Sequence, residues 1–173
     1  NQHLRAEFDG QGRLTRLLDR DADRELAVAG QPGNQFQMFE DTPGKYDAWD
    51  IVETYRDHPL PLDGTVTVVV EEQGPVRASL RVERSFAKSK LIQRIALESG
   101  GRRLLFETEV DWQERQRLLK VAFPVAINAE RATYDIAFAH IERSNRANTT
   151  YQRAQFEVNC HQWFDLSQHD AGV

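Results

Sequence analysis

Hydrophobic and polar residues alternate along much of this chain with a period of two. In residues 76–83, the even positions are apolar (Val, Ala, Leu, Val) and the odd positions are polar or charged (Arg, Ser, Arg, Glu). This alternation predicts a β-strand with one buried face. Residues 66–70 begin a similar extended segment, and Gly74-Pro75 between the two is a turn signal. The pair therefore predicts an antiparallel hairpin.

The same pattern recurs on both sides of this hairpin. It predicts strands over residues 91–98 and 104–111, joined by a turn at 99–102, and a strand over 134–138. Near the start, residues 4–8 and 14–18 flank the turn 9–12 and predict another hairpin. Short strands separated by turns roughly every ten residues are typical of an all-β sandwich or barrel.

Three segments do not follow this alternation. Residues 112–120 are rich in helix formers, so a short helix there competes with a strand, and the surrounding β pattern favours the strand. Two long segments, 31–50 and 142–150, have no clear period and are expected to be irregular. Loops carry binding and catalytic residues more often than strands do, so these two segments are the first places to look for function.

Composition narrows the classes of protein that the chain can represent. The chain has 173 residues and a net charge of −5. This length is that of one domain, or part of one, and is enough to bury a core without metals or disulfides. No apolar run reaches the roughly 18 residues of a membrane-spanning helix, and a secretory signal is absent from the start. The pI near 5.6 argues against a nucleic-acid partner. With Cys160 alone, no intrachain disulfide can form, so we expect a reducing, cytoplasmic location.

The ends of the chain suggest a segment of a longer protein. The sequence does not begin with Met, and it stops at Gly172-Val173 without a polar tail. We therefore expect an excised segment.

Metal and nucleophile motifs give no support for catalysis. The five histidines show none of the spacings typical of zinc ligands, so we expect surface or core-edge histidines, with no metal site and no cofactor in this chain. There is no Gly-x-Ser-x-Gly elbow and no Gly-rich phosphate loop. Cys160 adjoins His161, but neighbouring residues in a strand point to opposite faces. The prediction for Cys160 is an ordinary buried cysteine.

The segment 39–50 is the one place where acidic and aromatic residues interleave. Its acids are Glu40, Asp41, Asp47 and Asp50, and its aromatics are Phe39, Tyr46 and Trp49. This mixture is typical of a sugar-binding surface, where rings stack on pyranose C–H groups and carboxylates accept hydrogen bonds from hydroxyls. The alternative is a loop whose aromatics pack on the core and whose acids cap turns.

The segment 141–150 is polar and contains two arginines, Arg143 and Arg146. A guanidinium can bind a carboxylate or a sugar hydroxyl through several N–H groups at once. The alternative is an ordinary long connection.

These two loops, together with further stretches, resemble the α-mannosidases of glycoside hydrolase family 38, and in particular their bacterial and cytosolic branch. The resemblance extends over essentially the whole chain, in several independent segments that occur in the family's order. The matching segments are 39–43, 47–51, 110–115, 118–124, 132–136, 140–143, 148–149, 156–158 and 161–167.

The resemblance implies a fold and a role. It implies that residues 1–173 are a single antiparallel β-sandwich segment of the galactose mutarotase-like (supersandwich) type, incomplete at its C-terminus and excised from a longer multidomain enzyme. The parent would hydrolyse terminal α-mannosyl residues with retention, using two carboxyl groups about 5–5.5 Å apart. The family's zinc ligands and nucleophilic Asp belong to its N-terminal domain, and no segment here matches them.

The implied role of this segment is therefore non-catalytic. It would pack on the catalytic domain of its own chain and shape the sugar pocket, with Asp47, Trp49, Asp50 and Arg143 at the rim. Residues 144–147 depart from the family pattern, so no contact is inferred for them.

Two other functions remain open, namely an autonomous carbohydrate-binding module and a purely structural sandwich. The expected partners are an α-mannoside substrate, through the parent, and the parent's catalytic domain. Because excision leaves strand edges unpaired, we also predict an edge-strand homodimer of the segment.

Overall fold

The computed structural model describes residues 1–42, 44–46 and 49–173, and their regular secondary structure is almost entirely antiparallel β-strand. The N-terminal strands are β1 (Leu4–Phe8), β2 (Leu14–Asp19), β3 (Arg24–Glu25), β4 (Gln35–Glu40) and β5 (Pro59–Leu60). The central strands are β6 (Val66–Gln73), β7 (Arg77–Phe86), β8 (Ser89–Glu98), β9 (Leu104–Asp111) and β10 (Arg117–Ala122). The C-terminal strands are β11 (Arg131–Ile136), β12 (Ala139–Ser144), β13 (Phe164–Asp165), β14 (Ser167–Gln168) and β15 (Ala171–Gly172). A 3-10 helix η1 (Glu53–Asp57) and a short helix α1 (Thr150–Ala154) complete the described structure.

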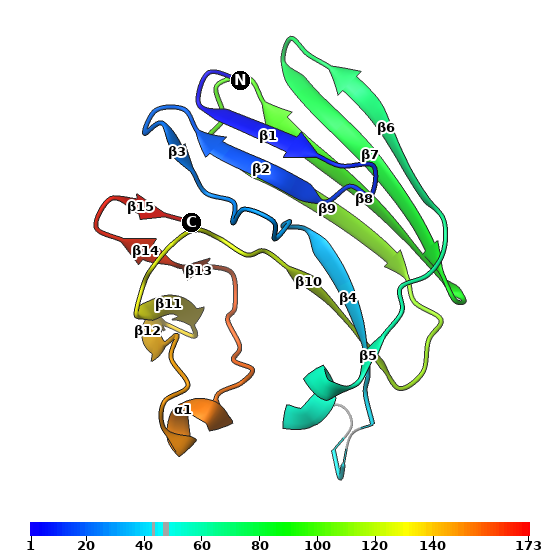
Figure 1. Ribbon diagram of the computed structural model, residues 1–173, viewed down its shortest axis with the longest axis vertical. Helices are drawn as coiled ribbons and strands as arrows, with labels where there is room; N and C mark the ends of the chain where they lie inside the picture. Colours follow the sequence, from blue (N-terminus) through cyan, green and yellow to red (C-terminus); the bar gives the residue numbers. More distant parts are fainter. Residues whose placement is uncertain (43, 47–48) are drawn as a thin grey trace.

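Two sheets form the layers of a sandwich, as the sequence predicts. The four-stranded sheet β6-β7-β8-β9 lies behind the sheet β1-β2-β3, with the hairpin β1–β2 in front of β8 and β9 (Figure 1). Both predicted hairpins are present, with the turns that the sequence indicates. The all-β class and the antiparallel sandwich are therefore confirmed.

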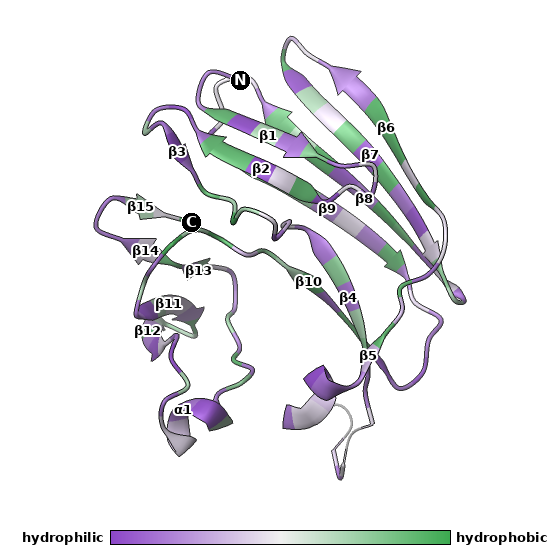
Figure 2. Ribbon diagram, viewed as in Figure 1, coloured by the Kyte–Doolittle hydropathy of each residue, from purple (hydrophilic) through white to green (hydrophobic). Residues whose placement is uncertain are grey.

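The large sheet shows how alternating residues create one apolar face. In β7 and β8, Val82, Phe86, Leu91 and Ile95 are buried on the inner face. Each such side chain contributes about 1.5–3 kcal/mol through the removal of apolar surface from water. The outer face carries charged residues that pair across strands, for example Arg94 Nε with Glu71 Oε2 at 2.6 Å. The alternation of hydrophobic and hydrophilic residues is visible along these strands (Figure 2).

The sheet β10-β4-β5 extends the sandwich and contributes to its core. Met38 of β4 packs with Phe86 and Leu91 in a buried cluster. The expectation that all of residues 31–50 are irregular is therefore wrong for 35–40. These residues form a strand because β10 pairs along their whole length, from Arg117 opposite Glu40 to Ala122 opposite Gln35.

The ambiguous segment 112–120 divides into two parts. Its second part belongs to β10, so the prediction of a strand is correct from Arg117 onward. Residues 112–116 instead form the connection from β9, in which Gln116 has a φ of 52°. Trp112 nevertheless keeps the inward direction of the even positions in β9, and its ring packs on Phe86 with centroids 6.2 Å apart.

The C-terminal part departs from the predictions in three further places. The expectation that all of residues 142–150 are irregular is wrong for 142–144, which belong to β12 because they pair with β11, and for Thr150, which begins α1. The strand predicted over 134–138 ends at Ile136, and Phe138 occupies the turn to β12 with a φ of 62° and a fully exposed ring. The hairpin turn overrides the β-propensity of the phenylalanine. Cys160, predicted to be buried, is exposed, because residues 158–160 form no strand and cover no core.

Candidate functional site

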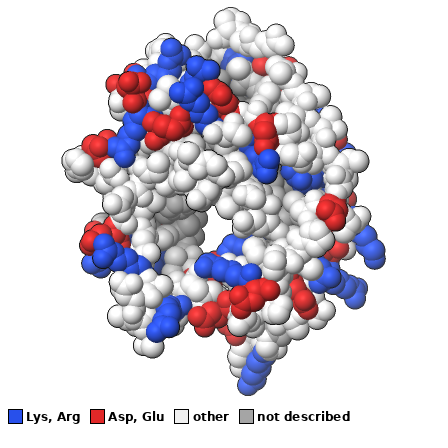
Figure 3. Space-filling model, viewed as in Figure 1, with Lys and Arg blue, Asp and Glu red and all other residues white. Residues whose placement is uncertain are grey.

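A polar cleft of about 590 Å³ lies between η1 and the segment that follows β12. Both elements are at the lower end of the molecule in Figure 1. The space-filling view shows a central opening with acidic and basic side chains along its lower border (Figure 3). The charged residues that line the cleft are Glu53, Arg56, Asp57, Arg143, Arg146 and Arg153.

Helix α1 forms one wall of the cleft and begins at a capping box. The Thr149 hydroxyl accepts a hydrogen bond from the Gln152 backbone N–H at 3.1 Å, and the Gln152 side chain accepts from the Thr149 N–H at 3.1 Å. Such reciprocal bonds satisfy backbone donors that a short helix would otherwise leave free. They fix the direction in which Gln152 and Arg153 project at the cleft.

Arg143 is the predicted rim residue that the structure places in the cleft. It lies on β12 opposite Ala132, and its guanidinium sits 4.9 Å from the centre of the Tyr134 ring. One of its nitrogens, Nη1, donates to the Asn159 backbone oxygen at 3.2 Å. The ring and this single bond orient the side chain while leaving most of its five N–H donors available to a ligand.

The opposite wall is held by a buried tyrosine. Tyr55 in η1 is only 2% exposed, and its ring packs edge-on against Phe39 of β4, with centroids 5.0 Å apart. Its hydroxyl donates to Glu157 Oε1 at 2.5 Å and accepts from Lys120 Nζ at 2.9 Å and from Arg56 Nε at 3.0 Å. This charged cluster therefore joins η1, β10 and the segment after α1 beneath the cleft.

Hydrogen bonds within this cluster favour the charged forms of Glu157 and Lys120. Burial alone would raise the pKa of Glu157, but hydrogen bonds from Lys120 and Tyr55 outweigh it, so that pKa lies below its ordinary value. Burial alone would lower the pKa of Lys120, and its bonds to Glu157 and Tyr55 raise it above the ordinary value. At neutral pH, Lys120 and Glu157 are thus both charged and in direct contact.

The other predicted rim residues have different positions. Trp49 is 86% exposed, and its backbone N–H donates to the Tyr46 oxygen at 3.0 Å, as does that of Asp50 at 2.9 Å. Neither residue lines the cleft formed by η1 and β12, although the segment leads directly into η1. Asp47 lies outside the described residues. The structure therefore brings Arg143 to the cleft and leaves Trp49 as a separate exposed ring.

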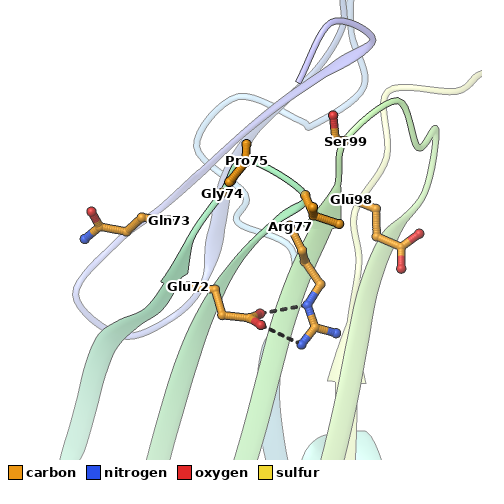
Figure 4. Close-up of a pocket in the computed structure, with 8 residues that line it drawn as sticks. Glu72, Gln73, Gly74, Pro75, Arg77, Glu98 and Ser99 are labelled. Atoms are coloured by element: carbon orange, nitrogen blue, oxygen red, sulfur yellow. Dashed lines mark hydrogen bonds and ion pairs between the residues drawn. The ribbon is translucent and has the colours of Figure 1, made fainter.

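A larger hollow, of about 850 Å³, lies beside the turns at the far end of the four-stranded sheet. Two of its charged groups are paired with each other: Arg77 donates to Glu72 through Nε at 2.7 Å and Nη2 at 3.0 Å (Figure 4). The Ser79 hydroxyl also donates to Glu72. Because Arg77 and Glu72 satisfy each other, the remaining charged side chain that lines the hollow is that of Glu98. We therefore regard it as a structural feature of the hairpin.

The chemistry of the cleft is suited to binding. Its walls present guanidinium groups, amides and an aromatic ring, which can hold hydroxyl or anionic groups of a ligand. Across residues 1–42, 44–46 and 49–173, no group of three or more His, Cys, Asp or Glu side chains is arranged to hold a metal ion. Within the same residues, no helix is long and apolar enough to span a membrane.

Sequence reasoning singled out Arg143 but missed the residues that surround it. Glu157 lies about 100 positions from the adjacent Tyr55 and Arg56, so no local spacing brings it to them. One local signal was available, since Thr149 followed three positions later by Gln152 is the pattern of a capping box. It would have placed a helix start at the edge of the cleft.

Comparison with known proteins identifies relatives along the entire chain. Residues 1–173 match the family described as the glycosyl hydrolases family 38 C-terminal domain. The chain is 37% identical over 175 residues to alpha-mannosidase 2C1 of Homo sapiens, and 36% identical over 180 residues to alpha-mannosidase G of Dictyostelium discoideum. These alignments take in all of this chain but only 17% and 16% of those proteins.

A solved structure supports the fold. The structure of a protein in glycosyl hydrolase family 38 from Enterococcus faecalis superposes with a TM-score of 0.66 at 14% sequence identity. The superposition covers 84% of this chain and 20% of that one. At this low identity, the likeness speaks for the architecture alone.

Proposed function

Because this chain belongs to the C-terminal domain family of the family 38 glycosyl hydrolases, we propose that it is the β-sandwich portion of an α-mannosidase that removes terminal α-mannosyl residues. The observation that carries the proposal is the match over all of residues 1–173, together with 37% identity to a named α-mannosidase. The chain spans about one sixth of the length of these relatives. Hydrolysis is therefore proposed for the longer enzyme.

In this proposal, the segment binds and positions while another part of the enzyme breaks the glycosidic bond. A retaining glycosidase needs a nucleophilic carboxylate and an acid–base carboxyl about 5–5.5 Å apart. The carboxylates at the cleft, Glu53 and Asp57, lie on a 3-10 helix among four arginines, where nothing singles out a nucleophile. The zinc expected from the family would likewise be held by the catalytic domain, since the described residues offer no cluster of ligands.

Arg143 is the residue that we propose contributes to the sugar pocket of the intact enzyme. Its guanidinium is oriented by Tyr134 and Asn159 and faces an open cleft. Such a pre-oriented donor loses little conformational entropy when it binds a hydroxyl or a carboxylate.

The test compares arginine variants in the full-length enzyme. Arg143→Ala should raise KM for an aryl α-mannoside about tenfold, which corresponds to about 1.4 kcal/mol, with unchanged thermal stability. Arg131→Ala is the matched control, because this arginine is 63% exposed, pairs with Glu142 at 3.3 Å and does not line the cleft among the described residues. Equal kinetics for both variants and the parent enzyme would support the alternative of a purely structural sandwich.

One observation favours sugar binding by the segment itself as a second candidate function. The Trp49 ring is 86% exposed, which is unusual for tryptophan and suits stacking on a sugar. Titration of the 173-residue chain with mannose or mannobiose, followed by tryptophan fluorescence, tests this candidate. Sub-millimolar binding that Trp49→Ala abolishes and Trp163→Ala preserves supports an autonomous module. If no binding is detected, the segment contributes to the sugar pocket only as part of the intact enzyme.

A further inference from the structure

The backbone oxygen that orients Arg143 belongs to an irregular segment, residues 156–163, which follows α1 and leads to β13. Asn159 lies near the middle of this segment, and Arg143 Nη1 donates to the Asn159 oxygen at 3.2 Å. Residues 158–163 are all exposed, so burial in the core does not hold this oxygen in place. Its position therefore depends on the contacts at the two ends of the segment.

The C-terminal end of the segment is held by Asp135 of β11. The Asp135 backbone oxygen accepts a hydrogen bond from the His161 N–H at 3.0 Å, and its carboxylate Oδ2 accepts from the Gln162 N–H at 3.2 Å. The Asp135 N–H donates in turn to the Trp163 oxygen at 3.0 Å. Three bonds to one strand residue fix this end on the sheet that also carries the ring beside Arg143.

The N-terminal end of the segment is held by the side chain of Glu157. Its Oε1 accepts from Tyr55 Oη at 2.5 Å and pairs with Lys120. Both partners are fixed by the core, because Tyr55 is buried and Lys120 belongs to β10, which pairs along the whole of β4. Arg56 adds a bond from Nη2 to the Phe156 oxygen at 3.1 Å. This end of the segment is therefore tied to the opposite wall of the cleft.

We propose that Glu157 is a positioning residue, which fixes the Asn159 oxygen and through it the Arg143 guanidinium. This inference rests on the proposed function, in which Arg143 binds the sugar. Glu157 lies two positions before Asn159, and two residues of chain span at most about 7 Å. A displacement of the Glu157 carboxylate is therefore passed on to the Asn159 oxygen, which is anchored beyond that point only through Asp135.

The charge of Glu157 is required for this role. Burial alone would raise the pKa of Glu157, but hydrogen bonds from Lys120 and Tyr55 bring it below its ordinary value, so the carboxylate is ionised at neutral pH. Glutamine has the same shape, but it offers a single neutral acceptor oxygen and turns an N–H₂ donor towards the cluster. Bonds to a neutral acceptor are about half as strong as those to a carboxylate. Glu157→Gln should therefore loosen the segment without creating a cavity.

Steady-state kinetics of the full-length enzyme with an aryl α-mannoside test this role through a double-mutant cycle. Glu157→Gln should raise KM about threefold and leave kcat unchanged, because the lost orientation of one flexible side chain must be restored on binding. In an Arg143→Ala background, the same substitution should change KM by less than about 1.3-fold. A merely structural role of Glu157 would affect the enzyme equally in both backgrounds.

Two further variants accompany Glu157→Gln. Tyr55→Phe is milder, because it keeps the ring against Phe39 and removes only the hydroxyl that donates to Glu157. It should raise KM in the same direction, again only where Arg143 is present.

Glu72→Gln is the matched control. Glu72 also accepts two bonds from an arginine, and its side chain is 39% exposed, compared with 30% for Glu157. It lies near the turn between β6 and β7, at the end of the molecule away from the cleft (Figure 1). This substitution removes a comparable charge pair and should leave KM unchanged.

Crystal structures of the full-length enzyme and of its Glu157→Gln variant distinguish a failure of this inference from a failure of the proposed function. We expect the distance from Arg143 Nη1 to the Asn159 oxygen to exceed about 3.5 Å in the variant, so that the hydrogen bond is lost. An intact bond overturns the inference, and so does a KM that rises equally in both backgrounds. If Arg143→Ala alone leaves KM unchanged, the proposed role of Arg143 in the sugar pocket fails, and the crystallographic distance still decides whether Glu157 positions it.

Discussion

The charged cluster beneath the cleft gives a quantitative prediction for Glu157→Gln. The substitution keeps the shape of the side chain and removes its charge. In the parent chain, Glu157 accepts from Tyr55 Oη at 2.5 Å, from Lys120 Nζ, and from Arg56 Nη2 at 3.5 Å. Each hydrogen bond to a charged group contributes about 1.5–3 kcal/mol to stability. Because the Glu157 side chain is 30% exposed, solvent screens its charge, and we expect the substitution to lower the free energy of unfolding by about 2 kcal/mol in total.

The assay is thermal unfolding of the 173-residue chain at neutral pH. For a chain of this size, a loss of about 2 kcal/mol lowers Tm by about 4–8 °C. Glu130→Gln is the matched control, because Glu130 also bonds to an arginine, Arg146, at 2.5 Å, but both side chains are more than half exposed. An exposed pair of this kind contributes less than about 1 kcal/mol, so the control should shift Tm by less than about 2–4 °C, half the shift expected for Glu157→Gln.

The pH dependence follows from the lowered pKa of Glu157. A carboxyl whose pKa is lower in the folded chain stabilises the fold at pH values above its unfolded pKa, and this contribution disappears as the pH falls through the folded value. The difference between the parent chain and Glu157→Gln should therefore be complete at pH 7 and shrink below about pH 4.3. Equal losses for Glu157→Gln and Glu130→Gln, or a loss that does not change at low pH, would refute this account of the cluster.

Three further predictions concern local structure, each measured by thermal or urea unfolding of the same chain. Gly64→Ala should destabilise the chain by more than about 2 kcal/mol, because its φ is +151° and an added Cβ would lie 1.8 Å from a backbone oxygen of β7. Gly10→Ala is the control: an added Cβ there would have no atom within 4 Å, so stability should change by less than about 0.5 kcal/mol. Phe138→Asn should leave stability unchanged or raise it by up to about 1 kcal/mol, because the ring is fully exposed and asparagine tolerates the positive φ; a loss above 1 kcal/mol contradicts this. Gln93→Met should cost about 1–3 kcal/mol, because it leaves the buried Asn34 oxygen without the donor that now lies 3.1 Å away; a neutral result would mean that this buried pair adds nothing.

The parts of the fold that the sequence predicts well are those in which one strand face is buried by sequence neighbours. Strands β7 and β8 are joined by a tight turn, and their alternation alone determines which side chains point inward. Strand β4 was missed because its pairing partner, β10, lies about 80 residues further along the chain. Its adjacent Met38 and Phe39 also interrupt the alternation of apolar and polar residues. Non-local pairing of this kind leaves no mark in the local pattern.

The candidate site follows the same rule. Arg143 was identified because a polar segment with two arginines is unusual and because the segment resembles the family. Its surroundings were not identified, since the cleft depends on a contact between η1 and Glu157 that spans about 100 residues. The prediction that Trp49 shares a site with Arg143 is not tested by this cleft, because Trp49 does not line it. A mixture of acidic and aromatic residues in one segment does not establish that the segment lies beside another one.

The pairing of β4 with β10 has a consequence for the order in which the chain folds. The four strands β6–β9 are consecutive and joined by short turns, so they can form a sheet as soon as residues 66–111 leave the ribosome. Strand β4 is synthesised earlier and can pair with β5 along one edge, yet its other edge has no partner until β10 emerges. Closing that long loop costs more entropy than closing a hairpin. Between the synthesis of β4 and the emergence of β10, the apolar side chains of β4 are exposed to solvent and to other chains. This interval is the stage at which chaperones would protect the nascent protein most effectively.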